Sequence, residues 1–480
     1  MLSRRLVLMA VSFVPACSSL LSGGEKPNII LVMADDQGWG DMAYNGHPML
    51  KTPNFDKAAA TGLRFDRFYA AAPVCSPTRA SVLTGRHPNR SGVFKWGYPL
   101  RPQESTVAEV LKTAGYATSH FGKWHLGSVR RASPAHPGRN GFDHWLSAPN
   151  FFDNNAILSL RGKAVKTTGE SSMVTVDAAL EWIGGRARRD DPFLAVVWFG
   201  SPHSPHRAVD RDRKPYADQP MRDQHFLGEV TGMDRAFGKL RDALGPLGIR
   251  DNTILWYCSD NGALPRVGSA GPFRGHKGQI YEGGLLVPSI LEWPARIKSP
   301  RRTSVRCNTC DIYPTLLEIV GVRPKHQPTL DGVSLARMID GKMPKRPRPM
   351  GFWDFRARGI STPSAKWMRE LLVAQQNGDD LPPHASSQKA AELPSPAHPL
   401  DRFPGHAAWI DGHWKLHRIE NKDGSVRFEL YDLATDPSEK TDLAADQSKR
   451  VAQLKPGLTD WLKSVVGSYN GDDYVKEPAR

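Results

Sequence analysis

The chain has 480 residues, of which 40% are hydrophobic, so it is long enough to bury more than one core. Glycine and proline stay well below the share that marks a disordered chain, which predicts a globular protein. The formal net charge of +15 favours anionic partners, but the basic residues are scattered and accompany no zinc-finger spacing or RNA-binding aromatic motif. We therefore expect an acidic ligand and no nucleic acid.

Residues 1–24 have the pattern of an export signal. Arg4 and Arg5 precede an apolar run that is too short to span a bilayer but fits the core of a signal peptide. We expect export to the periplasm, the outer membrane or the outside of the cell. A twin-arginine signal and a lipid anchor on Cys17 are alternatives, and Pro15 departs from the residues that a lipoprotein signal prefers. No later run is long and apolar enough for a transmembrane helix.

The first expected strand, 28–34, ends in two adjacent carboxylates, Asp35 and Asp36. Its continuous apolar run is typical of a buried parallel strand, and open α/β sheets bind ligands at the carboxyl ends of such strands. Adjacent carboxylates repel one another unless a cation neutralises them, so one interpretation is a hard metal ion bound through oxygen. An exposed Asp-Asp turn is the alternative.

The segment 73–85 predicts a short helix that begins near Cys75. Pro77 suits the first turn, where its missing N–H has no helical partner in any case. The free N–H groups at a helix start favour an anion or a nucleophile, and Arg79 adds a cation one turn further on. A cysteine in this position can equally be a small buried apolar residue.

This helix region resembles the signature of type I sulfatases, because it has the pattern Cys75-x-Pro77-x-Arg79-x-x-x-Leu83-Thr84-Gly85. In that family a maturation enzyme converts the cysteine to formylglycine. The resemblance therefore implies this modification at Cys75 and a place in the catalytic site for both Cys75 and Arg79.

Two further segments resemble the same family. Residues 115–127 form an expected strand and a glycine-bounded loop, and they resemble the second family signature, in which a lysine and a histidine face the sulfate and the formylglycine. The resemblance assigns these places to Lys123 and His125, which taken alone would be a surface lysine and a hydrogen-bonded histidine. The loop 275–284 resembles the family pattern Gly-x-Lys-x-x-x-x-Glu-Gly-Gly, whose lysine binds sulfate, and this implies the same role for Lys277.

A Pro-His-x-Pro loop follows the expected buried strand 192–199. Its two prolines keep the loop out of a helix. In sulfatases the first histidine of such a loop contacts the sulfate and its leaving oxygen, so the resemblance assigns this role to His203. His206 is either a neighbour of the site or exposed.

The strand expected at 253–257 leads to Asp260 and Asn261. A carboxylate and an amide oxygen at this strand end would complete four protein ligands with Asp35 and Asp36. All four ligand atoms are oxygens, which favours Ca²⁺ over the histidine-bound zinc of related phosphatases. The Asp-Asn pair also resembles the sulfatase family.

The remaining elements predict the architecture. Together with the resemblance, they predict an α/β fold in which helices sandwich a large, mixed, mostly parallel sheet, as in alkaline phosphatase. We expect a catalytic domain at 25–343 and a C-terminal subdomain at 344–480, with an antiparallel sheet, a helix and a proline-rich insertion near 377–405. The other expected elements are helices at 106–114, 174–186, 225–244, 311–320 and 447–465, and strands at 285–292, 413–417 and 428–432.

The resemblance implies a sulfuric ester hydrolase that acts on an organic sulfate ester, and a sulfated glycan is the expected substrate. Hydrated formylglycine would attack sulfur, His203 would protonate the leaving alcohol, and His125 would help to expel sulfate. One alternative is a formylglycine-dependent phosphodiester or phosphonate hydrolase. Another is a binding protein for sulfated glycans in which Cys75 stays unmodified. Loops such as 145–153 and 353–358, together with the insertion, are expected to form the walls of the substrate pocket.

The other cysteines predict no disulfide framework. Cys258 falls in a strand-like run and is expected in the core. Cys307 and Cys310 form a lone Cys-x-x-Cys pair, which is a local disulfide, a redox pair or two packed thiols, and which is no zinc site without a second pair. We favour a structural role for this pair.

Overall fold

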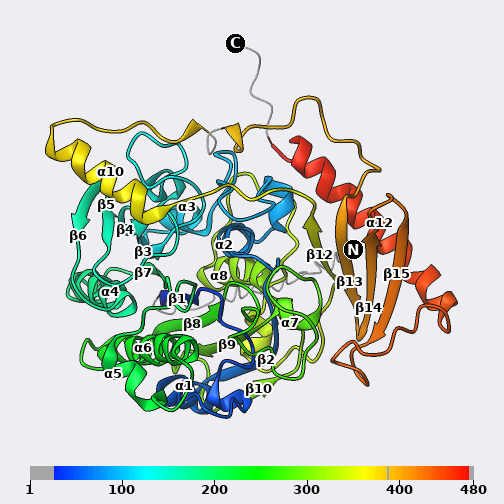
Figure 1. Ribbon diagram of the computed structural model, residues 1–480, viewed down its shortest axis with the longest axis horizontal. Coiled ribbons are helices and arrows are strands. Elements are labelled where there is room, and N and C mark those ends of the chain that lie inside the picture. The colour runs from blue at the N-terminus through cyan, green and yellow to red at the C-terminus, as the bar shows by residue number, and fades with distance from the viewer. Residues whose placement is uncertain (1–25, 386–388, 475–480) are drawn as a thin grey trace, which may run out of the picture.

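The computed structural model describes residues 26–385 and 389–474, which form a large sheet covered by helices and a smaller sheet beside it (Figure 1). The expected export signal and Cys17 lie outside the described residues. Within the described ranges, no helix combines the length and the apolar character that a bilayer crossing requires.

The large sheet is mixed and mostly parallel, as the sequence predicts. Strands β8, β1, β7, β3 and β4 are neighbours and run parallel, so their carboxyl ends meet at one edge. Strand β9 is antiparallel to β2 and β8, and β5 and β6 continue the far edge as antiparallel strands. In sheet order the strands are β10 (Arg301–Thr303), β2 (Leu63–Tyr69), β9 (Leu286–Glu292), β8 (Thr253–Ser259), β1 (Asn28–Ala34), β7 (Phe193–Trp198), β3 (Ala117–Lys123), β4 (His144–Ala148), β5 (Ile157–Leu160) and β6 (Lys163–Lys166), and β11 (Cys307–Asn308) also pairs with β2.

Helices cover both faces of this sheet (Figure 1). Because successive side chains of a strand point to opposite faces, β1 contributes to two cores. Ile29, Leu31 and Met33 belong to the core under one helix layer, whereas Ile30 and Val32 belong to the other. The first layer contains α2 (Cys75–Thr84), α3 (Val107–Thr113) and α8 (Ile312–Val320), and the second contains α1 (Pro53–Thr61), α4 (Ser171–Ala187) and α6 (Met221–Ala243).

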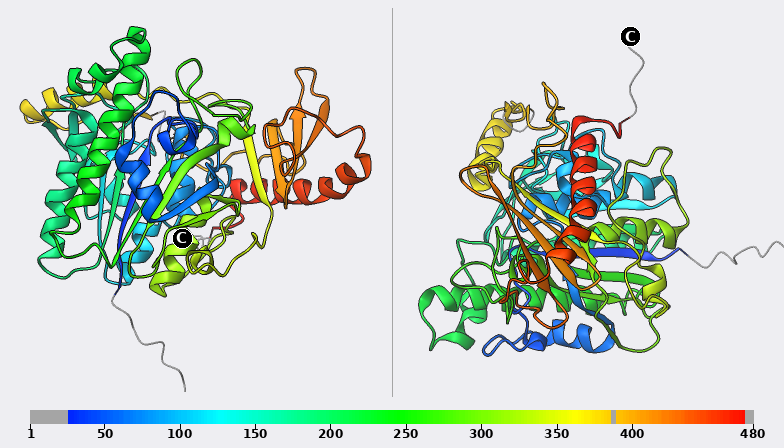
Figure 2. Two further views of the ribbon diagram at one scale, coloured as in Figure 1. Left: turned by 90° about the horizontal axis from the view of Figure 1, so that it is seen from below. Right: turned by 90° about the vertical axis from the view of Figure 1, so that its right-hand side faces the viewer.

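The smaller sheet is antiparallel, with the order β12, β13, β14 and β15. The long helix α12 (Ser448–Asn470) lies across one face of it and closes a separate core between helix and sheet. Figure 2 shows this arrangement from two sides. The opposite face packs on the large domain through a cluster that joins Tyr69 and Leu286 to Phe352 and Tyr431. The strands are β12 (Met350–Phe355), β13 (Gly405–Asp411), β14 (Trp414–Glu420) and β15 (Val426–Asp432).

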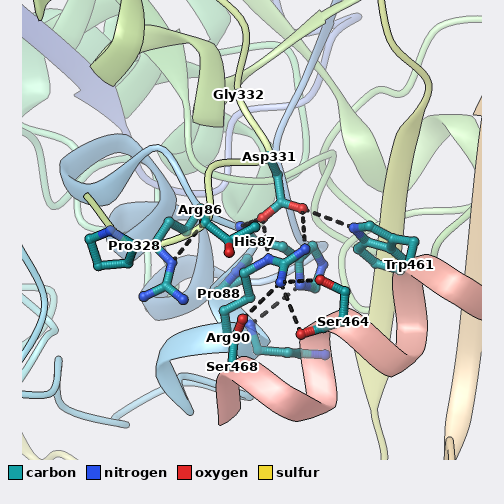
Figure 3. A network of polar contacts seen from close by, with 12 residues as sticks. Arg86, His87, Pro88, Arg90, Pro328, Asp331, Gly332, Trp461, Ser464 and Ser468 are labelled. Atoms are coloured by element: carbon teal, nitrogen blue, oxygen red, sulfur yellow. Dashed lines mark hydrogen bonds and ion pairs between the residues drawn. The ribbon is translucent and has the colours of Figure 1, made fainter. Parts of the chain in front are cut away.

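Polar contacts fasten α12 to the large domain close to the end of α2 (Figure 3). The 3-10 helix η2 (Pro88–Ser91) carries Arg90, whose Nη1 donates to the hydroxyl groups of Ser464 and Ser468 on α12 at 3.0 and 2.8 Å. Asp331 accepts from Arg90 Nε at 2.7 Å and from Trp461 Nε1 at 2.9 Å. A largely buried carboxylate with several donors is stabilised in its charged form, so this contact fixes the relative position of the two units.

Shorter elements complete the described chain. Helix α10 packs on the edge strand β6, where Gln375 Oε1 accepts from the backbone N–H of Ala164 at 2.9 Å, and no helix was expected there. Of the stretch expected as an insertion, residues 377–384 and 390–404 contain neither helix nor strand. The other short elements are α5 (Asp210–Arg213), α7 (Glu282–Leu285), α9 (Ala336–Ile339), α10 (Ser364–Gln376), η1 (Ala43–Asn45), η3 (Pro137–Asn140), η4 (Lys214–Tyr216) and η5 (Thr309–Asp311).

Besides Cys75, the three cysteines within the described residues are buried thiols. Cys258 lies on β8 in the core, as expected. Cys307 and Cys310 are both free and buried. Of the three alternatives for this pair, the structure therefore shows two packed thiols. The Sγ atom of Cys307 lies 3.3 Å from the carbonyl oxygen of Val305.

Candidate active site

Two neighbouring parallel strands bring the four oxygen ligands together. Asp35 and Asp36 follow β1, Asp260 and Asn261 follow β8, and the two strands pair in register up to Ala34 and Ser259. All four side chains are fully buried. Asp36 has a φ of +72°, which turns the chain sharply after the strand and lets its N–H donate to Asp260 Oδ1 at 3.0 Å.

The donor set fits a hard cation. Within the described residues, the buried atoms Asp35 Oδ1 and Asn261 Oδ1 have no hydrogen-bond partner. Buried polar atoms rarely stay unpaired, and carboxylate and amide oxygens are the ligands that Ca²⁺ prefers. Ligand atoms of Asp35 and Asp36 lie within 4.8 Å of one another and of His203, and an atom of Asp35 also lies within 4.8 Å of ligand atoms of Asp260 and Cys75. These residues can therefore hold one divalent ion.

Each carboxylate of this set is paired with one cation. Lys123 Nζ donates to Asp35 Oδ2 at 2.7 Å, and Lys277 Nζ donates to Asp36 Oδ2 at 2.6 Å. Arg79 Nη2 donates to Asp260 Oδ2 at 2.7 Å and also lies 3.7 Å from Asp35 Oδ1. Because three cations already balance three carboxylates, a bound divalent ion would leave the site positive and suited to an anionic substrate.

The cations change the pKa values of the carboxylates to different extents. Burial by itself would raise the pKa of Asp36, but the charges of Lys277, His203 and Lys123 outweigh it, so the pKa falls well below its ordinary value. Burial also opposes the charge of Lys277, whose pKa nevertheless rises because of Asp36. Burial and the neighbouring Asp35 raise the pKa of Asp260 to about 6, against the effect of Arg79.

Cys75 is the first residue of α2, as expected, and its side chain is only 2% exposed. Burial raises the pKa of its thiol above the ordinary value, although Lys123 and Lys277 act in the opposite direction. Because the thiolate is the nucleophilic form, this cysteine is a poor nucleophile while it remains unmodified.

The two histidines differ in their partners. Neither ring nitrogen of the buried His125 has a hydrogen-bond partner among the described residues, and burial followed by the charge of Lys123 lowers its pKa well below the ordinary value. His203 Nδ1 lies 2.6 Å from the carbonyl oxygen of Ser204, so the proton of the neutral ring is on Nδ1. Its Nε2 lies 3.6 Å from Asp36 Oδ2, and burial lowers its pKa to about 3.

One cavity of about 520 Å³ joins several of these groups. Arg79 and Lys123 do not line it and lie behind its wall, fully buried. Such a volume is in the usual range for small-molecule sites. The lining residues are Cys75, Trp96, His125, Asn150, His203, Lys277, Gly359, Ser361, Thr362 and Pro363.

The Sulfatase family model matches residues 27–322, a range that includes all ten of the expected site residues. The chain belongs to the sulfatase family. N-acetylgalactosamine-6-sulfatase of Mus musculus is 34% identical to it over 374 residues, which cover 68% of this chain and 69% of the mouse protein. Arylsulfatase A of Homo sapiens is 31% identical over 442 residues, which cover 82% of this chain and 85% of the human protein. The expected enzyme class, a sulfuric ester hydrolase, is confirmed.

Solved structures share the fold of this sulfatase. Ps i-CgsB in complex with k-i-k-neocarrahexaose superposes with a TM-score of 0.76 at 24% identity, over 92% of this chain and 93% of that chain. BT4656 in complex with D-glucosamine-2-N,6-O-disulfate gives a TM-score of 0.66 at 20% identity, over 94% and 100%. At these identities the likeness concerns the fold, and the expected α/β architecture is confirmed.

The walls of the sulfatase cavity were predicted only in part. Asn150 comes from the loop 145–153 that we expected to contribute, but the second expected loop, 353–358, ends one residue before Gly359, the first wall residue of its region. None of the described residues of the insertion expected near 377–405 lines this cavity, contrary to that expectation. No sequence pattern predicted that Trp96 lines the cavity, because contacts between segments that are far apart in the sequence determine its position.

A buried charge network lies beneath the loop that carries Lys277 in this sulfatase. Glu282 Oε1 accepts from Lys415 Nζ on β14 at 2.9 Å, and Glu282 Oε2 accepts from the hydroxyl of Tyr69 at 2.8 Å. Lys415 also lies 3.0 Å from Glu439 Oε1, which is 2.8 Å from His417 Nε2. The smaller sheet thereby fixes the end of the loop, and no sequence pattern predicted this role.

Proposed function

We propose that this sulfatase cleaves a sulfate ester of a glycan with a formylglycine formed from Cys75 by a maturation enzyme, and with one Ca²⁺ held by Asp35, Asp36, Asp260 and Asn261. The observation that carries the proposal is a single cavity that Cys75 shares with His125, His203 and Lys277, next to four buried oxygen ligands. The names of the relatives, which include N-acetylgalactosamine-6-sulfatase, support a glycan substrate.

The charged side chains bind the sulfate group. Lys277 lines the cavity and is oriented by Asp36, so its ammonium group can contact a sulfate oxygen. Lys123 and Arg79 act from behind the wall, where low polarity strengthens their field. When bound, Ca²⁺ would add two positive charges to this field and withdraw electron density from the sulfate. Formylglycine would supply a nucleophile that can later expel sulfate by elimination, which neither a thiol nor a serine hydroxyl can do.

The two histidines move protons in this proposal. His203 Nδ1–H donates to the carbonyl oxygen of Ser204, so Nε2 is the atom that would give a proton to the leaving oxygen of the substrate. Because burial keeps the free ring neutral, Nε2 must first take up a proton, and both Asp36, at 3.6 Å, and a bound sulfate anion would stabilise the protonated ring. His125 is neutral and has no partner among the described residues, so it can accept the proton that must leave before sulfate is released.

Sulfate release by protein that carries the aldehyde at residue 75 tests the proposal. We expect the wild-type protein to release sulfate from at least one member of a panel of sulfated sugars. Lys123→Ala and His203→Ala should lower kcat by about 10²- to 10⁴-fold. His413→Ala is the control and should keep wild-type turnover, because His413 is a half-exposed histidine in the turn between β13 and β14. The proposal is wrong if no sulfate is released from any sugar, or if both site variants keep full turnover.

Phosphate esters bind to the same kind of cation cluster, so a phosphodiester or phosphonate hydrolase is the second candidate. The phosphonate monoester hydrolase of Agrobacterium radiobacter has a related fold, with a TM-score of 0.59 at 20% identity. The ratio of kcat/KM for an aryl sulfate to that for the matching aryl phosphate separates the two candidates. We expect the sulfate to be preferred.

Export is a separate proposal, supported by the basic and apolar pattern of residues 4–14. Because the substrates of an exported sulfatase are outside the cytoplasm, export agrees with a glycan substrate. Fractionation of cells that produce the full chain, with N-terminal sequencing of the mature protein, tests it. Cleavage near residue 24 is expected, and an intact N-terminus in the cytoplasmic fraction would contradict it.

A further inference from the structure

An exposed tryptophan stands at the rim of the active-site cavity. All thirteen tryptophans lie in the described part of the chain, and Trp96 alone is more than a third exposed, at 46%. It lines the same cavity as Cys75 and His203. An aromatic ring that is exposed beside a catalytic cavity offers apolar surface that a bound ligand can cover, which would favour binding.

The backbone around this ring is held on two sides. The N–H of Ile360 donates to the carbonyl oxygen of Trp96 at 2.9 Å. The N–H of Gly97 donates to the hydroxyl oxygen of Ser76 at 2.9 Å, and Ser76 is the residue after Cys75 on α2. These two hydrogen bonds fix the position of Trp96 relative to α2, the helix that carries Cys75.

Two glycines make this arrangement possible. A Cβ atom on Gly359 would lie 2.0 Å from Cε2 of Trp96, so the indole ring lies directly against the Gly359 backbone. Gly97 has a φ of +82°, and a Cβ there would lie 2.0 Å from the carbonyl oxygen of Ile360. The chain therefore supports the ring from one side and leaves the remaining surface to the cavity, which is the arrangement of a rigid stacking surface.

The rest of the cavity wall is polar and, apart from Lys277, uncharged. It contains the amide of Asn150 and the hydroxyl groups of Ser361 and Thr362, and none of the described residues that line it carries a carboxylate. Asn150 Nδ2 donates to the carbonyl oxygen of Thr362 at 3.2 Å, which fixes the amide beside the hydroxyl groups. A flat apolar surface combined with uncharged hydrogen-bonding groups suits a ring that has C–H groups on its face and hydroxyl groups on its rim, as a pyranose has.

We propose that Trp96 is the stacking surface for the sugar ring that carries the sulfate ester, and that it selects a pyranose substrate at this site. The inference rests on the sulfatase function proposed above and adds a specificity-determining residue to it. The sulfate group would bind at Lys277, and the ring would lie on the indole with its hydroxyl groups toward Asn150 and Thr362.

Steady-state kinetics with the aldehyde-bearing protein test the inference. The probes are the monosaccharide sulfate that the wild-type protein hydrolyses best, starting with N-acetylgalactosamine 6-sulfate, and inorganic sulfate as a competitive inhibitor that has no ring. Trp96→Ala should raise KM for the sugar sulfate about tenfold, equivalent to one lost aromatic contact, and leave the inhibition constant of inorganic sulfate unchanged. Trp96→Phe should stay within about threefold of the wild type.

Two further variants separate stacking from general damage. Gly359→Ala displaces the indole ring without removing it and, like Trp96→Ala, should raise KM for the sugar sulfate. Trp367→Ala is the matched control, because Trp367 stacks on His384 at a centroid distance of 3.6 Å and does not line the cavity, so KM should not change. An unchanged KM in Trp96→Ala, or an equal weakening of inorganic sulfate, would overturn the inference. If the wild-type protein released no sulfate at all, the proposed function itself would fail instead.

Discussion

The ammonium group of Lys415 lies 2.9 Å from Oε1 of Glu282, and both side chains are buried. Lys415 belongs to β14 of the smaller sheet, whereas Glu282 closes the loop that carries Lys277 in the active site. The pair therefore connects the smaller sheet with the loop that positions Lys277, the cation proposed to bind sulfate. Lys415 also contacts Glu439, which in turn contacts the neutral His417. Lys415 is therefore the one cation that both buried carboxylates, Glu282 and Glu439, contact within this network.

Removal of Lys415 should destabilise the fold strongly. Lys415→Met leaves the buried Glu282 and Glu439 without their cation, and loss of one partner of a buried pair costs about 3 to 5 kcal/mol. Urea unfolding measures the change. The control is Lys239→Met, because Lys239 pairs with Asp177 while both side chains are about half exposed, and it should cost about 1 kcal/mol or less. Equal effects of the two substitutions would contradict the importance of the network.

Removal of divalent ions should lower the thermal stability of the protein. With a chelator the four proposed oxygen ligands would lose their common cation, and added Ca²⁺ at 100 times its Kd should restore about 2.7 kcal/mol. Differential scanning fluorimetry during a Ca²⁺ titration checks this. Asn261→Ala removes a buried oxygen that lacks a partner among the described residues and should reduce the Ca²⁺-dependent shift in Tm. Asn421→Ala, in an exposed turn, should keep the full shift, and coincident melting curves with and without Ca²⁺ would refute the metal site.

Asp331 should be essential for attachment of α12. Asp331→Ala leaves Arg90 without its carboxylate and Trp461 without its acceptor, and we expect a loss of about 3 to 5 kcal/mol in urea unfolding. Asp340 offers a matched control, because it also binds an arginine, Arg296, through two contacts of 2.6 and 2.9 Å, but on a partly exposed surface. Asp340→Ala should cost about 1 kcal/mol or less. A cost for Asp331→Ala as small as that of the control would show that α12 is held by its apolar face alone.

Stability should fall as the pH drops below the ordinary pKa of histidine. Burial lowers the pKa of His87 to about 3, so the folded protein keeps this ring neutral while the unfolded chain takes up a proton near pH 6.5. Between these values the unfolded state binds more protons, so the free energy of unfolding decreases with falling pH, by up to about 1.4 kcal/mol per pH unit for one such group.

Urea unfolding of His87→Asn at pH 7 and pH 5 tests this dependence. The difference in unfolding free energy between the two pH values should be smaller in the variant than in the wild type. Other buried histidines with lowered pKa values, such as His120, will leave part of the difference in place. His413→Asn changes a half-exposed ring and should not alter the difference. An identical pH dependence in His87→Asn and the wild type would disprove the assignment.

The elements with a strong apolar pattern were predicted well from the sequence. The helix expected at 311–320 is Ile312–Val320 and ends at Gly321, which has a φ of +72° and so takes the left-handed conformation that glycine favours. Strand β1 has the expected bounds. Helix α10 was missed because it buries only Ser364, Met368 and Leu371, too few residues for an apolar stripe.

Strand β2 was missed for a related reason. Charged residues such as Arg64 and Asp66 alternate with its apolar residues, so it lacks the continuous apolar run of a central strand, and its partner β9 is antiparallel. At the site, the strand ends that carry Asp35 and Asp260 could be predicted because a parallel sheet brings them to one edge. Trp96 and Thr362 could not, because packing between loops that are far apart in the sequence decides which of them reach the cavity.

The central claim is that the side chain at residue 75 acts only after its oxidation to an aldehyde. Preparations with different degrees of conversion can be made by varying the maturation enzyme during expression, and mass spectrometry of the peptide that contains residues 72–79 gives the aldehyde fraction of each. The rate of sulfate release from one sugar sulfate is then plotted against that fraction. We predict a straight line through the origin, whereas a rate that does not depend on the aldehyde fraction would contradict the account.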